Sequence, residues 1–146
     1  MSIRSKPTKQ NIARLTGQVI AAFGRHFSVE IQRGDIVSCV MRGKKGGVAC
    51  GDRVEIQLTT TGQGVIETIQ PRTSMLYRSD AFKEKIIAAN VTQVIIVVAA
   101  VPSFSEELIN RCLVAVESAN IAVLIVLNKA DLVEPTQAAM KTLALY

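Results

Sequence analysis

Hydrophobic and polar residues alternate in short segments through the first half of the chain, and turn residues such as Gly24, Gly34 and Gly62 separate the segments. Alternation of this kind predicts half-buried β-strands. The predicted strands are residues 15–22, 26–31, 36–41, 53–58 and 64–69. Five short strands within about 55 residues favour a small closed barrel of the oligonucleotide-binding (OB) type over residues 15–70, with an SH3-like barrel as the alternative.

The pattern changes after residue 90. Val94–Val101 and Ile121–Leu127 are unbroken apolar runs, which are typical of strands covered on both faces. Between the two runs, Ser103 and Glu106 have the spacing of a capping box that begins a helix, and Asn120 is a suitable left-handed stop for it. Strand, helix and strand in this order predict a βαβ unit with parallel strands.

Two segments show no clear period. The first 14 residues contain four basic and no acidic side chains, and we expect a mobile arm. Residues 71–89 are expected to be a connector. The predicted organisation is therefore an arm (1–14), an OB barrel (15–70), a connector (71–89) and the first part of an α/β domain (90–146), a β plus α/β fold class.

The basic character is confined to the first part of the chain. Residues 1–89 contain 14 Lys and Arg against 7 Asp and Glu, a net charge of +7, whereas residues 90–146 contain 3 against 5, a net charge of −2. This asymmetry predicts that the barrel meets a polyanion. The residues expected to bind RNA lie at predicted turns and are Arg25, His26, Arg42, Lys44 and Lys45.

Lys44 and Lys45 belong to the segment RGKKGG, in which glycines allow a phosphate to approach the backbone. The alternative is a basic hairpin in solvent. The segment is not a nucleotide phosphate loop, because Ser38 stands where the first glycine is required and Lys45 where the hydroxyl is required.

The three cysteines are too few and too scattered for a disulfide framework, and no Cys-x-x-Cys pair or histidine cluster proposes a metal site. The apolar runs are much shorter than the roughly 20 residues that cross a bilayer, and no signal-peptide core follows the basic amino terminus. These features predict a cytoplasmic protein without a membrane partner.

Asn128, Lys129, Ala130 and Asp131 follow the second apolar run and match the Asn-Lys-x-Asp pattern of guanine recognition. Guanine has two adjacent hydrogen-bond donors, and one carboxylate accepts from both. Each such charge-assisted bond contributes about 1.5–3 kcal/mol. The four residues are therefore a candidate guanine site, and the alternative is that Asp131 caps a following helix.

Neither a phosphate loop nor an Asp-x-x-Gly segment occurs in the 146 residues, and no residue of the chain is a candidate for catalysis. In the usual order of GTPase motifs, both come before the guanine motif. Either the protein is not a GTPase, or its motifs are permuted and the phosphate-binding parts lie downstream of Tyr146.

The sequence resembles the ribosome small subunit-dependent GTPase A family, which are circularly permuted GTPases with an amino-terminal OB barrel. The segments that carry the resemblance are TGQVIAAFGRHFSVE, CVMRGK, CGDRVEI, GVIETIQPRTSMLYR, AANVTQVIIVVAA and LIVLNKADL. Thr92 departs from the family, where Asp is expected. The phosphate loop, the switch segments and a carboxyl-terminal zinc domain are also absent.

The resemblance implies a late factor in maturation of the small ribosomal subunit, which binds ribosomal RNA through the barrel and hydrolyses GTP with Mg²⁺ when the subunit stimulates it. It implies that the stem of Lys129 lies along the base and that Asn128 ties the loop to its neighbours. It also implies a monomer, with structural zinc only in the absent domain. We expect the 146 residues alone to be inactive; the alternative is a stand-alone RNA-binding module without nucleotide hydrolysis.

Overall fold

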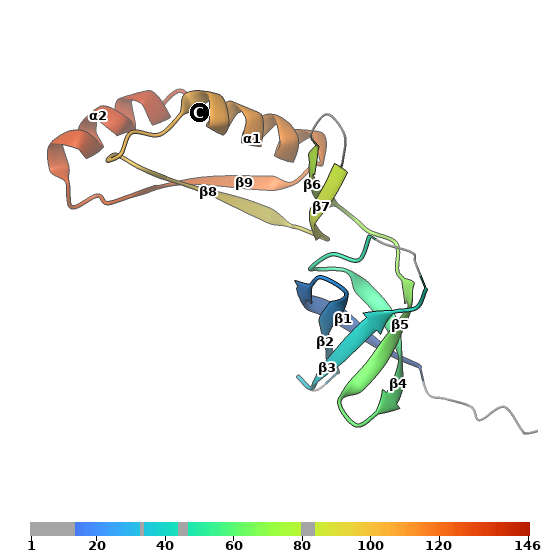
Figure 1. The fold of residues 1–146 in the computed structure, drawn as a ribbon. Coiled ribbons are helices and arrows are strands. Elements are labelled where there is room, and N and C mark those ends of the chain that lie inside the picture. Colours follow the sequence, from blue (N-terminus) through green and yellow to red (C-terminus); the bar gives the residue numbers. More distant parts are fainter. Residues whose placement is uncertain (1–13, 33, 44–46, 80–83) are drawn as a thin grey trace, which may run out of the picture. The chain divides into compact units, whose positions relative to one another are not determined.

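Nine strands and two helices make up the part of the chain described by the structure, a computed structural model in which residues 14–32, 34–43, 47–79 and 84–146 are placed (Figure 1). The chain divides into two compact units, residues 1–72 and 73–146. The elements are β1 (Arg14–Phe23), β2 (His26–Ile31), β3 (Ile36–Met41), β4 (Arg53–Thr60), β5 (Gln63–Ile69), β6 (Met75–Ser79), β7 (Glu84–Ala89), β8 (Gln93–Ala99), α1 (Glu106–Ser118), β9 (Ala122–Asn128) and α2 (Val133–Leu143).

The first unit is a closed five-stranded barrel in the order β1-β2-β3-β5-β4. β5 lies parallel to β3, and the other neighbouring strands are antiparallel. This strand order, with β3 parallel to β5, confirms the predicted OB-type barrel in place of the SH3-like alternative. Every predicted barrel strand is present and ends within two residues of its expected bounds.

Alternate residues of the barrel strands form its core. Val19, Val29, Val54, Ile56 and Ile66 are at most 1% exposed, as the period of two requires. Burial in this core raises the pKa of the Cys39 thiol to about 11, because the thiolate would lose its hydration.

β1 also approaches β2 very closely, because Gly17 has no side chain to separate the two strands. A Cβ built at Gly17 would lie 2.6 Å from the carbonyl oxygen of Glu30. A glycine is therefore required at this position by packing and not by backbone conformation.

A β-bulge interrupts the alternation in β1. The register with β2 shifts between Val19 and Ala21, so that Phe23 lies opposite His26. By the period of two, Phe23 would share the buried face of Val19, but the bulge turns it outward and it is 69% exposed. Arg14, which was expected to end the arm, begins this strand, and the rest of the arm lies outside the described residues.

The expected connector contains a β-hairpin, which corrects the prediction for residues 71–89. β6 and β7 are antiparallel, with Met75 opposite Ala89. A register shift between Leu76 and Tyr77 breaks the period of two, and for this reason the strands were not recognised in the sequence. This hairpin belongs to the second unit of the chain.

The predicted βαβ unit is confirmed. β8 and β9 are parallel and α1 connects them. The predicted start of the helix was two residues early: Ser105, not Ser103, is the N-cap, and its Oγ accepts a hydrogen bond of 3.2 Å from the Leu108 amide. The helix ends as expected, with Asn120 in the left-handed region at φ 52°.

The expectation that β8 and β9 are covered on both faces was wrong for the described residues. Ile95, Val97 and Leu124 are 55%, 62% and 47% exposed. The sheet has two strands, and α1 packs against it with its buried residues Ile109 and Val116 (Figure 1). Among the described residues, a single helix covers one face of this sheet.

Candidate nucleotide and RNA sites

The predicted guanine residues lie at the carboxyl end of the parallel strand pair. Asn128 is the last residue of β9 and pairs with Ala99, the last residue of β8. The loops that follow the two strands therefore leave the sheet at the same edge, which is the edge where α/β sheets bind ligands.

Lys129 joins these two loops. Its Nζ donates a hydrogen bond of 2.7 Å to the carbonyl oxygen of Val101, in the loop after β8. Its backbone is left-handed, with φ 62°, and its amide donates to Oδ1 of Asn128 at 2.8 Å. In this structure Lys129, through its hydrogen bond to Val101, connects the two loops. The family resemblance gave this role to Asn128. Asn128 instead accepts a hydrogen bond from the next residue and closes a local turn.

Asp131 has no hydrogen bond or ion pair with any other described residue, and it is exposed. α2 follows directly, but its N-cap is Leu132 and no side chain caps it. Pro135 lies in the first turn of this helix, where its missing amide proton costs nothing. The role of helix cap, which was the alternative for Asp131, is therefore not the one observed, and its carboxylate is free to accept two donors.

A groove of about 680 Å³ lies elsewhere in the second unit. It is lined by residues of β6 and α1, among them Tyr77, Arg111 and Val114. The groove does not include the strand-end loops. We place the candidate nucleotide site at the loops, because recognition of guanine depends on the free carboxylate and not on the volume of a cavity.

Three of the predicted RNA-binding residues lie at one end of the barrel. Arg25 is in the turn between β1 and β2, His26 begins β2 and Arg42 directly follows β3. Because β2 is antiparallel to both β1 and β3, these positions are at the same end. Lys44 and Lys45 lie outside the described residues.

Arg42 is engaged within the barrel. Its guanidinium donates to both carboxylate oxygens of Glu67, at 2.7 and 2.8 Å. The side chain of Glu67 is 13% exposed and that of Arg42 is 67% exposed. The charge of Arg42 is therefore balanced by Glu67, and its Nε–H and Nη2–H groups are not used in this pair.

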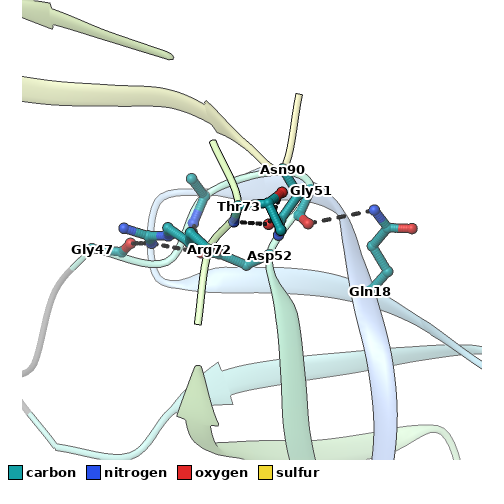
Figure 2. A network of polar contacts seen from close by, with 8 residues as sticks. Gln18, Gly47, Gly51, Asp52, Arg72, Thr73 and Asn90 are labelled. Atoms are coloured by element: carbon teal, nitrogen blue, oxygen red, sulfur yellow. Dashed lines mark hydrogen bonds and ion pairs between the residues drawn. The ribbon is translucent and has the colours of Figure 1, made fainter. Parts of the chain in front are cut away.

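The same end of the barrel holds a buried ion pair that the sequence did not predict. Asp52 is 0% exposed and accepts hydrogen bonds from Arg72 at 2.7 and 2.8 Å and from the Ala49 amide at 2.8 Å (Figure 2). Arg72 also donates to the carbonyl oxygen of Gly47. The hydrogen bond with Asp52 raises the pKa of Arg72, which keeps the guanidinium charged.

The sequence over residues 69–146 matches the family described as RsgA GTPase. The chain belongs to this family. The resemblance inferred from the sequence is thus confirmed.

Relatives named small ribosomal subunit biogenesis GTPase RsgA match most of the chain. The protein from Nitrosospira multiformis is 63% identical over 132 residues, which is 90% of this chain and 42% of the relative. The protein from Nitrosomonas europaea is 56% identical over 141 residues, which is 94% of this chain and 45% of the relative. The chain spans somewhat under half the length of these RsgA relatives.

Two solved structures share the fold. YjeQ from Thermotoga maritima has a TM-score of 0.68 and 31% identity, covering 90% of this chain and 47% of its own. YloQ, described as a circularly permuted GTPase, has a TM-score of 0.65 and 28% identity, covering 97% of this chain and 49% of its own. The OB-type barrel with a partial α/β unit is therefore the arrangement found in circularly permuted GTPases.

The described residues contain no group of His, Cys, Asp and Glu side chains that could hold a metal ion. No helix among them is long and apolar enough to span a bilayer.

Proposed function

We propose that this RsgA family protein is a guanine-nucleotide-dependent factor that acts in maturation of the small ribosomal subunit. The names of its relatives support a GTPase of small-subunit biogenesis. The observation that carries the nucleotide part is Asp131, an exposed carboxylate without a partner among the described residues, beside the carboxyl ends of two parallel strands. Such a carboxylate accepts from the two donors of guanine and not from the acceptor that adenine presents.

Within this proposal Asn128, Lys129, Ala130 and Asp131 form the guanine-binding loop. The hydrogen bond from Lys129 to Val101 holds the loop in place before the base arrives, and a loop fixed in advance loses less entropy on binding. The side chain of Lys129 is exposed, so its methylene stem is accessible to the plane of a base.

Hydrolysis requires groups that hold the phosphates and Mg²⁺. The described residues have no donor set for a metal ion, and no phosphate-loop pattern occurs between residues 1 and 146. We therefore propose hydrolysis, its stimulation by the subunit, and any zinc site for the full-length protein only. Residues 1–146 alone are proposed to bind guanine nucleotides weakly, as a monomer in the cytoplasm.

The barrel is proposed to bind ribosomal RNA through Arg25, His26, Arg42, Lys44 and Lys45. The support for this is the gathering of Arg25, His26 and Arg42 at one end of an OB-type barrel, since this fold binds oligonucleotides through its loops and the face of its second and third strands. A phosphate contact made by these side chains would weaken with salt.

The guanine proposal is tested by Asp131→Asn in the full-length protein, with Glu134→Gln, an exposed carboxylate in α2, as the matched control. Loss of one charge-assisted bond reduces affinity for GDP by at least about tenfold. The asparagine amide oxygen accepts from the ring N1–H, and its amide NH2 donates to the C2 carbonyl oxygen that xanthine has in place of the amino group of guanine. Titration with fluorescent GDP and XDP should show weaker GDP and stronger XDP binding for Asp131→Asn alone; identical titrations for both variants and wild type would refute the assignment.

A further inference from the structure

Phe23 is an exposed aromatic side chain at the basic end of the barrel. The bulge between Val19 and Ala21 turns it away from the core, and it is 69% exposed. Burying Phe23 in a core would contribute a favourable free energy that this arrangement forgoes. Bulges often re-aim a side chain next to a functional site, and this bulge directs an apolar ring into solvent.

The ring lies in a row that crosses three strands of the barrel. Phe23 is directly opposite His26, and His26 is directly opposite Val40. Residues paired in this way have Cβ atoms about 5 Å apart. All three side chains are exposed on the outer surface of β1, β2 and β3, which lie side by side (Figure 1).

The next row along the same surface is small and polar. Ser28 pairs with both Ala21 and Ser38. The two serine hydroxyls border the apolar row and both donate and accept hydrogen bonds. An aromatic ring paired with an imidazole, with hydroxyl groups in the next row, suits a planar ligand that has hydrogen-bonding groups on its rim.

The charge around this surface is positive. Arg25 lies in the turn that joins Phe23 to His26, and Arg53 begins β4 at the same end of the barrel. Neither arginine forms an ion pair with a described residue. The carboxylates of the described residues at this end, Asp52 and Glu67, are each paired with an arginine. The free charge there is therefore cationic and complements a phosphate backbone.

We propose that Phe23 and His26 form a stacking platform for an unpaired RNA base, with the phosphate of that nucleotide at Arg25. This inference rests on the proposed binding of RNA by the barrel and specifies its ligand as single-stranded RNA. Duplex RNA is not a suitable ligand, because its bases are stacked on one another and are not available to an aromatic side chain. Stacking of a base on an aromatic ring is tolerant of sequence and strengthens single-strand binding.

The test measures binding of the full-length protein to a short single-stranded RNA that contains 2-aminopurine, over a series of salt concentrations. Phe23→Ala should weaken binding by between about fivefold and a hundredfold, abolish the quenching that stacking produces, and leave the salt slope unchanged. Phe23→Tyr should retain both affinity and quenching. Arg25→Ala should instead reduce the salt slope by about 0.7, as expected for one phosphate contact on a single strand.

The matched control is Ile36→Ala, since Ile36 is 59% exposed on the outer surface of β3 at the opposite end of the barrel. It should bind as the wild type does. Equal affinity and quenching of Phe23→Ala and wild type would overturn the platform while leaving the proposed RNA binding intact, whereas failure of the wild type to bind any RNA would overturn both.

Two other outcomes also overturn the platform. One is a preference of the wild type for a duplex of the same length. The other is a Phe23→Ala variant that loses affinity for purified small subunits but not for the free oligonucleotide, because a ribosomal protein would then occupy this surface.

Discussion

Removal of the Arg72 guanidinium should strongly destabilise the barrel. The carboxylate of Asp52 is fully buried and receives two hydrogen bonds from Arg72, so Arg72→Met leaves a charge where water does not reach it. Breaking a buried ion pair by removal of one partner costs about 3–5 kcal/mol. Because the side chain of Arg72 is 22% exposed, we expect the lower end of that range, about 3 kcal/mol.

A double-mutant cycle separates the interaction free energy of Asp52 with Arg72 from the cost of losing each side chain. Asp52→Asn should also destabilise the barrel, and the double variant should cost less than the sum of the two, with a coupling free energy of about 2 kcal/mol. The control is Arg53→Met, because Arg53 is exposed and directly follows Asp52 in the sequence. This variant should change the free energy of unfolding by no more than about 0.5 kcal/mol.

Cys39 provides a reporter confined to the barrel. Its side chain is 1% exposed, so a thiol reagent reacts with it only when the barrel opens. In a background of Cys50→Ser and Cys112→Ser, the labelling rate over a urea series gives the free energy of opening. Arg72→Met should raise the opening equilibrium roughly a hundredfold. The reasoning fails if Arg72→Met and Arg53→Met are labelled at the same rate, or if the cycle is additive.

Two further predictions concern the stability of the barrel, and the first uses the labelling of Cys39. Gly17→Ala should destabilise the barrel by about 1–3 kcal/mol, because the new Cβ would meet the Glu30 carbonyl oxygen at 2.6 Å; labelling of Cys39 at the wild-type rate would contradict this. Burial raises the pKa of Cys39 from 9.0 to about 11, so the neutral thiol's contribution to stability, on the order of 3 kcal/mol, is present below pH 9 and is lost as the pH rises towards 11. Amide exchange at a series of pH values should therefore show a steeper alkaline loss of stability in wild type than in Cys39→Val, and parallel profiles would exclude this linkage.

The sequence predicted those parts of the fold whose causes are local. Alternation from His26 to Ile31, and the turn signal at Gly34 ahead of Ile36–Met41, located two barrel strands at their observed bounds. The left-handed stop at Asn120 was also predicted, because few residue types adopt that conformation at low cost. The guanine-binding and RNA-binding assignments remain predictions, although the structure brings Arg25, His26 and Arg42 to one end of the barrel.

The features that the sequence did not predict depend on residues far apart in the chain or on a change of register. Asp52 and Arg72 are separated by 20 positions, and no local pattern marks them as partners. The bulge in β1 reverses the face on which Phe23 lies, whereas a reading by period assigns it to the core. The exposed face of β8 and β9 was missed because apolar runs indicate which residues favour burial and not whether a second layer covers them.

The parallel contact between β3 and β5 has a consequence for how the barrel forms. β1, β2 and β3 join through short turns, and β4 and β5 form a separate hairpin at Gly62. The three-stranded meander and the hairpin are joined by two strand pairs, β1 with β4 and β3 with β5. Neither pair joins strands that are adjacent in the chain. The entropy lost in closing the intervening segment is therefore offset only when the meander and the hairpin make contact. We therefore expect docking of the β4–β5 hairpin onto the β1–β2–β3 meander to limit the folding rate of the barrel.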